Sequence, residues 1–181
     1  EMCIRDRFLS VSAFCNAGFD PFGFENSITP YVADPVVNFV IMALIILGGI
    51  GFSVILDVLR ARRWSRLTLH SRVVLLMTGI LIVFGTLMTC LLEWNNPKTL
   101  DNGLNPAEKV MAAGFQSVTL RTAGFDTIGQ GDLTPAGQMV SIILMFIGAS
   151  PASTGGGIKT TTFFIVLLSV VVMIRRKEDY N

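Results

Sequence analysis

Two short loops carry the residues best suited to chemistry, because they repeat one string at distant positions. Ala-Gly-Phe-Asp follows Asn16 and again follows Thr122, and a Ser-Val pair lies a few residues before each copy. A four-residue match is weak alone, but an acidic stretch containing Gly and Pro and then a long apolar run follow both copies. We interpret the chain as duplicated units whose equivalent loops surround one axis. The candidate site residues are Asn16, Ala17, Gly18, Phe19, Thr122, Ala123, Gly124 and Phe125.

The chemistry expected of these loops is coordination of a cation by backbone carbonyl groups. Asn105 followed by Pro106 is a typical helix start and predicts a helix over residues 106–119. The C-terminal end of such a helix carries partial negative charge and favours a cation. Gly124 then permits backbone conformations in which consecutive carbonyls face one axis, as they do in cation filters. The structural alternative is a pair of Gly turns that cap helices.

Composition places the chain among membrane proteins. Hydrophobic residues make up 51% and charged residues 15%, well below the charge content of soluble domains. Residues 36–56 and 73–92 contain no charge, and each run is long enough to cross a bilayer core as a helix. The net charge of +1 indicates no nucleic-acid partner, and the three cysteines lack metal-binding spacing. We find no nucleophile–base pair, so we expect no enzymatic activity.

A Gly-rich break interrupts the third apolar run. Between Leu133 and Ile174 the only charged residue is Lys159, and a straight helix of that length would reach about 60 Å. That is about twice the thickness of the bilayer core, so the break over 148–157 must lie at membrane depth. Irregular backbone is tolerated there only against protein or a water-filled cavity. The predicted fold is therefore all-α and integral to the membrane, with repeated helix–re-entrant pore loop–helix units and a broken helix after the second pore loop.

Basic residues indicate the orientation of the spans. Positive charge gathers in the connection 57–72 and in the tail after Ile174, whereas 20–35 holds acidic residues and no Lys or Arg. Positively charged connections remain in the cytoplasm, so helix 36–56 runs inward and helix 73–92 runs outward. We expect one repeat to occupy 8–60 and a cytoplasmic basic loop 61–72. The next repeat then covers 73–177, with helix 73–92, pore loop 105–126 and broken helix 135–174, before a cytoplasmic tail 178–181.

Together these motifs resemble the Trk/Ktr/HKT superfamily of potassium transporters, and most of all its Ktr-type bacterial subunit. The resemblance covers residues 8–177 and rests on 12–19, 47–52, 67–70, 116–125 and 148–161. It implies four covalently joined pore-loop units around one pore, in the bacterial inner membrane. It also implies potassium uptake, with the ion held at Asn16, Ala17, Thr122 and Ala123. The break becomes a gate loop beneath the filter, comprising Gly148, Ser150, Pro151, Ser153, Thr154, Gly155, Gly156, Gly157 and Lys159.

The resemblance also implies partners. Members dimerise and assemble with a cytoplasmic ring of regulatory subunits that bind nucleotide, so no cofactor is expected on this chain itself. Only two of the four pore loops are present, which predicts that the missing repeats belong to the same protein. The polar stretch 1–7 does not fit the apolar pore helix of the family, and we interpret it as a foreign or artefactual N-terminus that is excluded from reasoning about the fold.

Two charged residues and one other function class remain open at this stage. Lys159 is expected to be an intramembrane charge near the path, although it could instead snorkel to the surface. Arg121 is expected to hold the second pore loop by hydrogen bonds or an ion pair. The alternative function is a secondary transporter whose broken helix binds another small solute or cation near the bilayer midplane.

Overall fold

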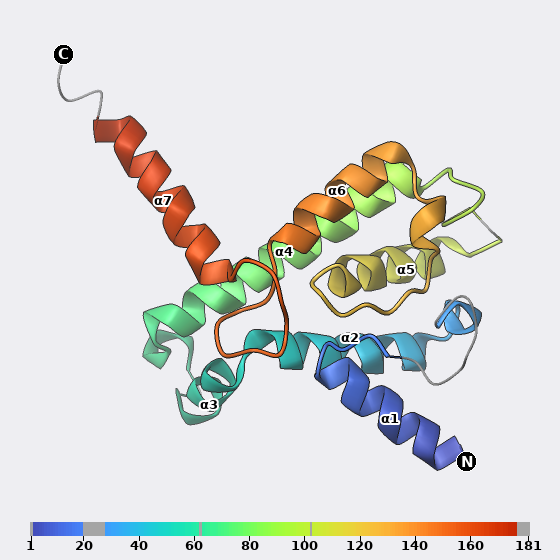
Figure 1. Cartoon of the computed structure of the whole chain (residues 1–181), viewed down its shortest axis with the longest axis horizontal. Helices are drawn as coiled ribbons and strands as arrows, with labels where there is room; N and C mark the ends of the chain where they lie inside the picture. The colour runs from blue at the N-terminus through green and yellow to red at the C-terminus, as the bar shows by residue number, and fades with distance from the viewer. Residues whose placement is uncertain (1, 20–27, 62, 102, 177–181) are drawn as a thin grey trace.

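The fold is all-α, as predicted. A computed structural model describes residues 2–19, 28–61, 63–101 and 103–176, and these ranges contain helices and no strand (Figure 1). The α-helices are α1 (Met2–Phe14), α2 (Pro35–Ile50), α3 (Phe52–Ala61), α4 (Leu69–Glu93), α5 (Pro106–Thr119), α6 (Pro135–Phe146) and α7 (Thr160–Arg176). Short 3-10 turns lie at Thr29–Tyr31, Trp64–Arg66 and Gln130–Asp132.

Within these ranges one helix is long and apolar enough to cross a membrane by itself. This helix is α4, with 25 residues, and the bent pair α2–α3 is a second candidate span. α4 begins where the Thr68 hydroxyl accepts a hydrogen bond from the amide of Ser71 and caps the first turn. In Figure 1 the basic start of α4 and the C-terminal end of α7 lie on the same side, opposite the starts of α5 and α6. This arrangement agrees with the orientation expected from the basic connections.

The prediction of one continuous helix over 36–56 is wrong. The chain bends by 96° between α2 and α3, at Gly51. Gly51 has φ +92°, outside the helical region, and a Cβ there would lie 2.7 Å from the carbonyl oxygen of Pro151. The amide of Phe52 donates to the carbonyl of Ala152 at 3.3 Å, which replaces its bond within the helix. The close approach of the Gly-rich break therefore ends α2.

α5 is the central helix and lies at the position expected for a pore helix. Pro106 occupies its first turn, and the Glu108 carboxylate accepts from the amide of Asn105 at 2.8 Å, as in a capping box. α5 packs on α4 and α2, and its Phe115 is fully buried. Phe115 and Phe125 share one core cluster with Ala13 of α1, with Ile41 and Ile45 of α2, and with Ile28, Val118 and Ala123. This cluster fixes both repeated loops against the same helices.

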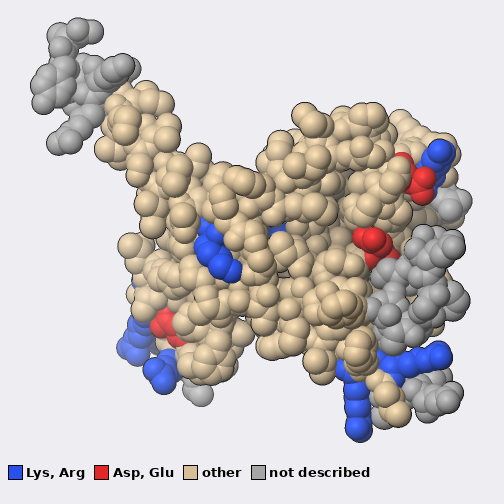
Figure 2. Space-filling model, in the orientation of Figure 1, with Lys and Arg blue, Asp and Glu red and all other residues tan. Residues whose placement is uncertain are grey.

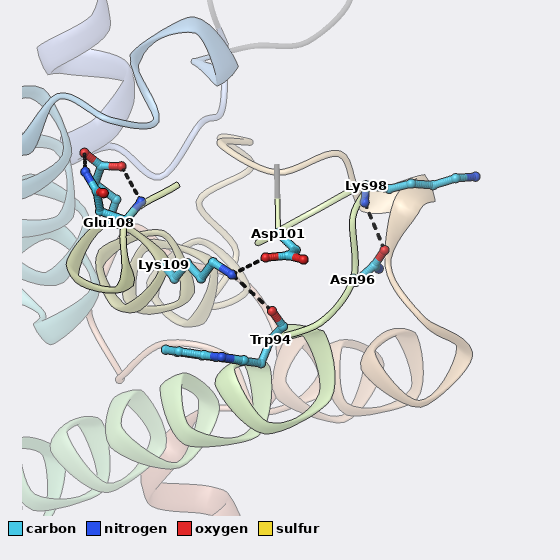
Figure 3. A network of polar contacts seen from close by, with 7 residues as sticks. Trp94, Asn96, Lys98, Asp101, Glu108 and Lys109 are labelled. Carbon is cyan, nitrogen blue, oxygen red and sulfur yellow. Dashed lines mark hydrogen bonds and ion pairs between the residues drawn. The ribbon is translucent and has the colours of Figure 1, made fainter. Parts of the chain in front are cut away.

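Lys109 of α5 contacts the connection between α4 and α5. Figure 3 shows Lys109 together with the residues that it contacts. The Lys109 ammonium lies 2.5 Å from the carboxylate of Asp101 and 3.4 Å from the carbonyl of Trp94. It also lies 5.4 Å from the centre of the Trp94 ring, within range of a cation–π interaction. A basic residue in the first turn of α5 is thereby neutralised, and the helix is anchored to the end of α4.

The broken helix has the form expected over 135–174. α6 lies alongside α4, whereas α7 points away from the other helices (Figure 1). At 1.5 Å per residue, α6 is about 18 Å long and α7 about 25 Å, so neither spans the core of the bilayer alone. Most of α7 is exposed and apolar, including Ile165 and Met173. This surface suits lipid or protein neighbours in the membrane.

The first helix includes part of the polar stretch at the start of the chain. α1 begins at Met2, so residues 2–7 continue the helix that leads into the first repeated loop, and their interpretation as a foreign N-terminus stays a prediction. Residues 4–7 are exposed in this structure. Contact with the core begins at Leu9, which packs against the cluster that contains the fully buried Ala13.

Glu93 joins the end of α4 to the start of α6. Its carboxylate is buried and accepts from the amide and hydroxyl of Thr134, at 2.9 and 2.6 Å. The same group accepts from the side chains of Asn96 and Thr99, at 2.6 and 3.0 Å. A buried carboxylate with four donors is stabilising because each bond is charge-assisted, and loss of the charge leaves donors poorly paired.

We therefore predict that Glu93→Gln lowers the free energy of unfolding by about 1.5–3 kcal/mol, the range for hydrogen bonds to charged groups. Thermal unfolding of the full-length protein in detergent, followed by size-exclusion chromatography, measures the effect. Glu108→Gln is the matched control, because glutamine also serves in a capping box. Equal melting temperatures for the two variants would contradict the assigned role.

Candidate functional site

The two repeated loops lie in direct contact, although they are far apart in the sequence. A Cβ built on Gly18 would lie 2.8 Å from the carbonyl oxygen of Ala123 and 2.9 Å from the Cα of Gly124. Conversely, a Cβ on Gly124 would lie 3.2 Å from the Cα of Gly18. No side chain fits between the two backbones, so glycine is required at both positions.

Both loops also share an unusual backbone conformation. Asn16 and Gly18 have φ of +50° and +69°, and Thr122 and Gly124 have +71° and +81°. The alanine between each pair is not in this region. Positive φ at a β-branched residue such as Thr122 is rare and marks a conformation imposed by the surroundings. Alternation of this kind reverses every second peptide unit, which lets consecutive carbonyls face one side.

Hydroxyl groups at the ends of the preceding helices hold both loops. Ser12 Oγ donates to the carbonyl of Phe19 at 2.7 Å, and Thr119 Oγ1 donates to the carbonyl of Phe125 at 2.6 Å. Thr119 Oγ1 also accepts from the amide of Phe125 at 3.0 Å. Three residues separate Ser12 from Asn16, but two separate Thr119 from Thr122. The first loop thus has one additional residue and the same anchoring.

An open cavity of ≈ 390 Å³ lies beside these loops. Its lining includes both loops and the start of the next segment: Asn16, Ala17, Thr119, Leu120, Thr122, Ala123, Gly124, Asp126, Gln130 and Met145. The candidate potassium ligands Asn16, Ala17, Thr122 and Ala123 are therefore brought to one cavity. Phe19 and Phe125 are not among the lining residues, and the buried Phe125 belongs to the core.

Sequence reasoning missed a polar chain beside this cavity. Gln130 donates to the carboxylate of Asp126 at 2.8 Å, and the buried Gln116 donates to Gln130 at 3.0 Å. The sequence did contain a clue to this chain of contacts, because Asp126 is the last residue of the repeated Ala-Gly-Phe-Asp string. Its counterpart Asp20 lies outside the described residues. The carboxylate of Asp126 places negative charge on a cavity suited to cations.

The Gly-rich break lies directly against both loops. Asn16 Nδ2 donates to Thr154 Oγ1 at 3.2 Å, and the same hydroxyl donates to the carbonyl of Phe14 at 3.1 Å. On the other loop, the amide of Gly156 donates to Thr122 Oγ1 at 2.9 Å. The first residue of each repeated loop is therefore bound to the break.

The break also caps the C-terminal end of α2. The amide and hydroxyl of Ser150 donate to the carbonyl of Gly49, at 3.1 and 3.0 Å, and the hydroxyl also donates to Ile50. The amide of Thr154 donates to the carbonyl of Gly48 at 3.3 Å. Helix ends leave such carbonyls without partners within the helix, and here the break supplies them.

Within the break, backbone bonds fold the chain on itself. Gly148 donates to the carbonyl of Ile158 at 3.0 Å, and a side chain on Gly148 would overlap Gly156. Gly157 has φ +75°, and Ser153 Oγ donates to the carbonyl of Ser150 at 2.5 Å. The carbonyl of Pro151 lies against Gly51, as described above. The predicted gate-loop residues thus form one folded unit rather than an extended linker.

Lys159 and Arg121, the two charged residues near the break, differ in their hydrogen bonds. Lys159 Nζ donates to the carbonyl of Gly155 at 2.8 Å, so the charge is held on the break itself. Arg121 is 6% exposed, but its Nε and Nη2 atoms have no hydrogen-bond partner among the described residues. The expectation that Arg121 holds the loop by hydrogen bonds or an ion pair is therefore wrong for these atoms within this part of the chain.

Comparison with known proteins decides the family. A family model named TrkH, described as cation transport protein, matches residues 6–181. The chain belongs to the TrkH family. It is 42% identical over 147 residues to the Ktr system potassium uptake protein B of Bacillus subtilis, and 41% identical over 152 residues to that of Vibrio alginolyticus. The alignments cover 81% and 82% of this chain and 32% of each relative, so the chain spans about a third of their length.

Another relative and a solved structure agree with this assignment. The potassium/sodium uptake protein NtpJ of Enterococcus hirae is 39% identical over 147 residues, covering 81% of this chain and 32% of that protein. The crystal structure of the potassium transporter TrkH from Vibrio parahaemolyticus matches with a TM-score of 0.71 and 20% identity, over 91% of this chain and 34% of that one. The TrkH-type fold is thereby confirmed, and so is the Ktr-type resemblance.

The anchoring of the second loop leads to a test of its architecture. We predict that Thr119→Val lowers the free energy of unfolding by about 1–3 kcal/mol, because the buried amide and carbonyl of Phe125 lose their hydroxyl partner. Thr119→Ser retains the hydroxyl and is expected to stay near the wild type. Unfolding of the full-length protein in detergent measures both. Similar stability of the valine and serine variants would show that the hydroxyl does not hold the loop.

Proposed function

We propose that this chain forms part of a potassium uptake path across the bacterial plasma membrane. In this proposal Asn16–Phe19 and Thr122–Phe125 supply two segments of a filter lined by backbone carbonyls. The observation that carries it is the contact between two loops with the same alternating positive φ, at one cavity. Carbonyl groups that replace the hydration shell of an ion are the common basis of potassium filters. The names of the relatives support potassium as the ion.

The break at 148–159 is then the gate of this path. It donates to or accepts from the first residue of each filter segment, so its position is coupled to both. The loop would have an open and a closed arrangement that differ by a few kcal/mol. A partner that binds one arrangement more tightly would raise the fraction of molecules in that arrangement. The Lys159 ammonium adds a positive charge to the closed loop and opposes passage of cations.

The remaining parts of the assembly are proposed from the length of the relatives and from the resemblance to the Ktr-type subunit. We propose that the rest of the protein supplies further pore loops, since two segments cannot surround an ion on all sides. We further propose that the protein dimerises, and that a cytoplasmic ring of nucleotide-binding regulatory subunits acts on the gate loop. Nucleotide would then bind to those subunits and not to this chain.

The filter proposal predicts an altered ion preference in Gly124→Ser. A side chain at φ +81° and 3.2 Å from the Cα of Gly18 must shift the backbone and its carbonyls. We expect uptake by the full-length protein to lose at least about tenfold in preference for potassium over sodium, equivalent to about 1.4 kcal/mol. Competitive uptake of rubidium and sodium into cells that lack other potassium transporters measures this ratio. Gly131→Ser is the control, because nothing lies near its Cβ, and an unchanged ratio in Gly124→Ser would refute the filter role.

The gate proposal predicts faster flux in Thr122→Val. This variant keeps the shape of the side chain but removes the acceptor for the amide of Gly156, a bond worth about 1 kcal/mol. We expect several-fold higher flux with unchanged ion preference, whereas Thr122→Ser should behave as the wild type. Flux into liposomes containing the full-length protein distinguishes these outcomes. If the break binds substrate, as in the alternative secondary transporter, the valine variant should instead lose transport.

A further inference from the structure

A basic surface beside the inner end of α2 has no part in the proposed ion path. Among the described residues, α3 and the 3-10 turn after it expose several arginines and large apolar side chains. We call this set the α3 surface: Phe52, Leu59, Arg60, Arg63, Trp64 and Arg66. Figure 2 shows basic side chains and one acidic group at this end of the molecule, at its lower left, and further basic side chains at other places on the same face.

The α3 surface follows the inner end of α2 in the orientation that the basic connections indicate. α3 turns 96° from α2 after the single residue Gly51. With α2 crossing the membrane as expected, a turn of this size directs α3 along the membrane plane, because no linker separates the two helices. Phe52, Leu59 and Trp64 are 69%, 67% and 56% exposed. A short helix with exposed apolar residues, arginines and tryptophan is typical of segments that lie in the membrane interface.

Arg60 attracts the carboxylate of Asp57, but none of the three arginines of this surface forms a salt bridge with a described residue. Asp57 is the acidic residue within 52–72, and its carboxylate accepts from the amide and hydroxyl of Thr68, at 3.0 and 2.8 Å. Among the described residues the salt bridge lies elsewhere, between Lys109 and Asp101. The turn is itself folded, because Arg72 donates to the carbonyl of Ser65 at 2.5 Å. Arg63 and Arg66 are therefore exposed on a turn whose backbone is held by hydrogen bonds.

We propose that the α3 surface binds the phosphate headgroups of anionic phospholipids in the cytoplasmic leaflet. Arginine pairs with phosphate through several parallel hydrogen bonds, and clusters of basic residues next to a span attract anionic lipid. The apolar side chains lie among the upper acyl chains while the guanidinium groups remain at the headgroups. A soluble protein partner fits this surface less well, because it would have to cover large apolar residues within the interface.

Lipid bound here acts next to the gate loop. Phe52, the first residue of α3, donates its amide to the carbonyl of Ala152 in that loop. A headgroup that holds α3 in the membrane plane therefore stabilises the observed contact between Gly51 and Pro151. Binding itself depends on the α3 surface alone and does not require the proposed potassium path.

Fluorescence of Trp64 tests the binding. The full-length protein is placed in nanodiscs that contain the same fraction of dibrominated phosphatidylglycerol or dibrominated phosphatidylcholine, and Trp64→Phe isolates the signal of Trp64. We expect stronger quenching by the brominated phosphatidylglycerol. The combined variant Arg60→Gln, Arg63→Gln, Arg66→Gln should lose that preference, by about fivefold in relative association constant for each arginine.

Two controls make the result decisive. Replacement of the same three residues by lysine keeps the charge and should retain most of the preference. Lys98→Gln removes one charge at the other side of the molecule and should change nothing. Equal quenching of the wild type by both lipids, or an unchanged preference in the glutamine variant, would overturn the proposal. Absence of quenching by either lipid would also overturn it, since a protein would then cover the surface.

Discussion

The structure depends on one constraint, which is that backbone polar groups inside a bilayer must find partners in the protein. Two segments of this chain cannot supply partners for all of their own backbone polar groups. α2 ends at Ile50 with carbonyls that no further helical turn can satisfy, and the break at 148–159 has irregular backbone at membrane depth. The two segments pair with each other, because Ser150 and Thr154 of the break donate hydrogen bonds to the free carbonyls of α2. The end of one repeat and the middle of the next are thereby fixed together.

This shared solution places the break beneath the repeated loops. Once the break is bound to α2, its other polar groups lie within reach of Asn16 and Thr122. Small residues are needed for the break to approach the second repeated loop. Gly155, for example, has no room for a side chain between Ala149 and Thr122. If the break is the gate that we propose, it would open only when several bonds of about 1 kcal/mol each are exchanged for others. That cost is within the range that a bound subunit or lipid can shift.

The sequence predicted those parts of the fold that local chemistry determines. The apolar run of α4, the capping of α5 by Asn105 and Glu108, and the break between α6 and α7 follow from composition and from typical start and stop residues. The bend at Gly51 was not predicted, because a glycine in an apolar run is compatible with a continuous helix. Only the approach of Pro151, about 100 residues later, makes that helix impossible.

The candidate site was predicted as a set of residues but not as a geometry. The repeated string identified the two loops, since both need glycine for the same reason. It could not indicate that the loops touch, or that the first contains one additional residue before Asn16. Gln116 and Gln130 were missed because their pairing with Asp126 depends on how α5 packs beside the returning loop. Arg121 Nε and Nη2 have no partner among the described residues, although a buried guanidinium is usually paired, and no feature of the sequence shows which partners are within reach.

The most direct measurement is the position of the ion in the full-length protein. Crystals grown in rubidium give anomalous scattering that locates the ion independently of the protein model. Our account predicts a peak in the cavity at the carbonyls of Asn16, Ala17, Thr122 and Ala123, outside the gate loop, and loss of that peak when sodium replaces rubidium. A peak within the break at 148–157, or sites remote from both loops in a protein that transports, would contradict it.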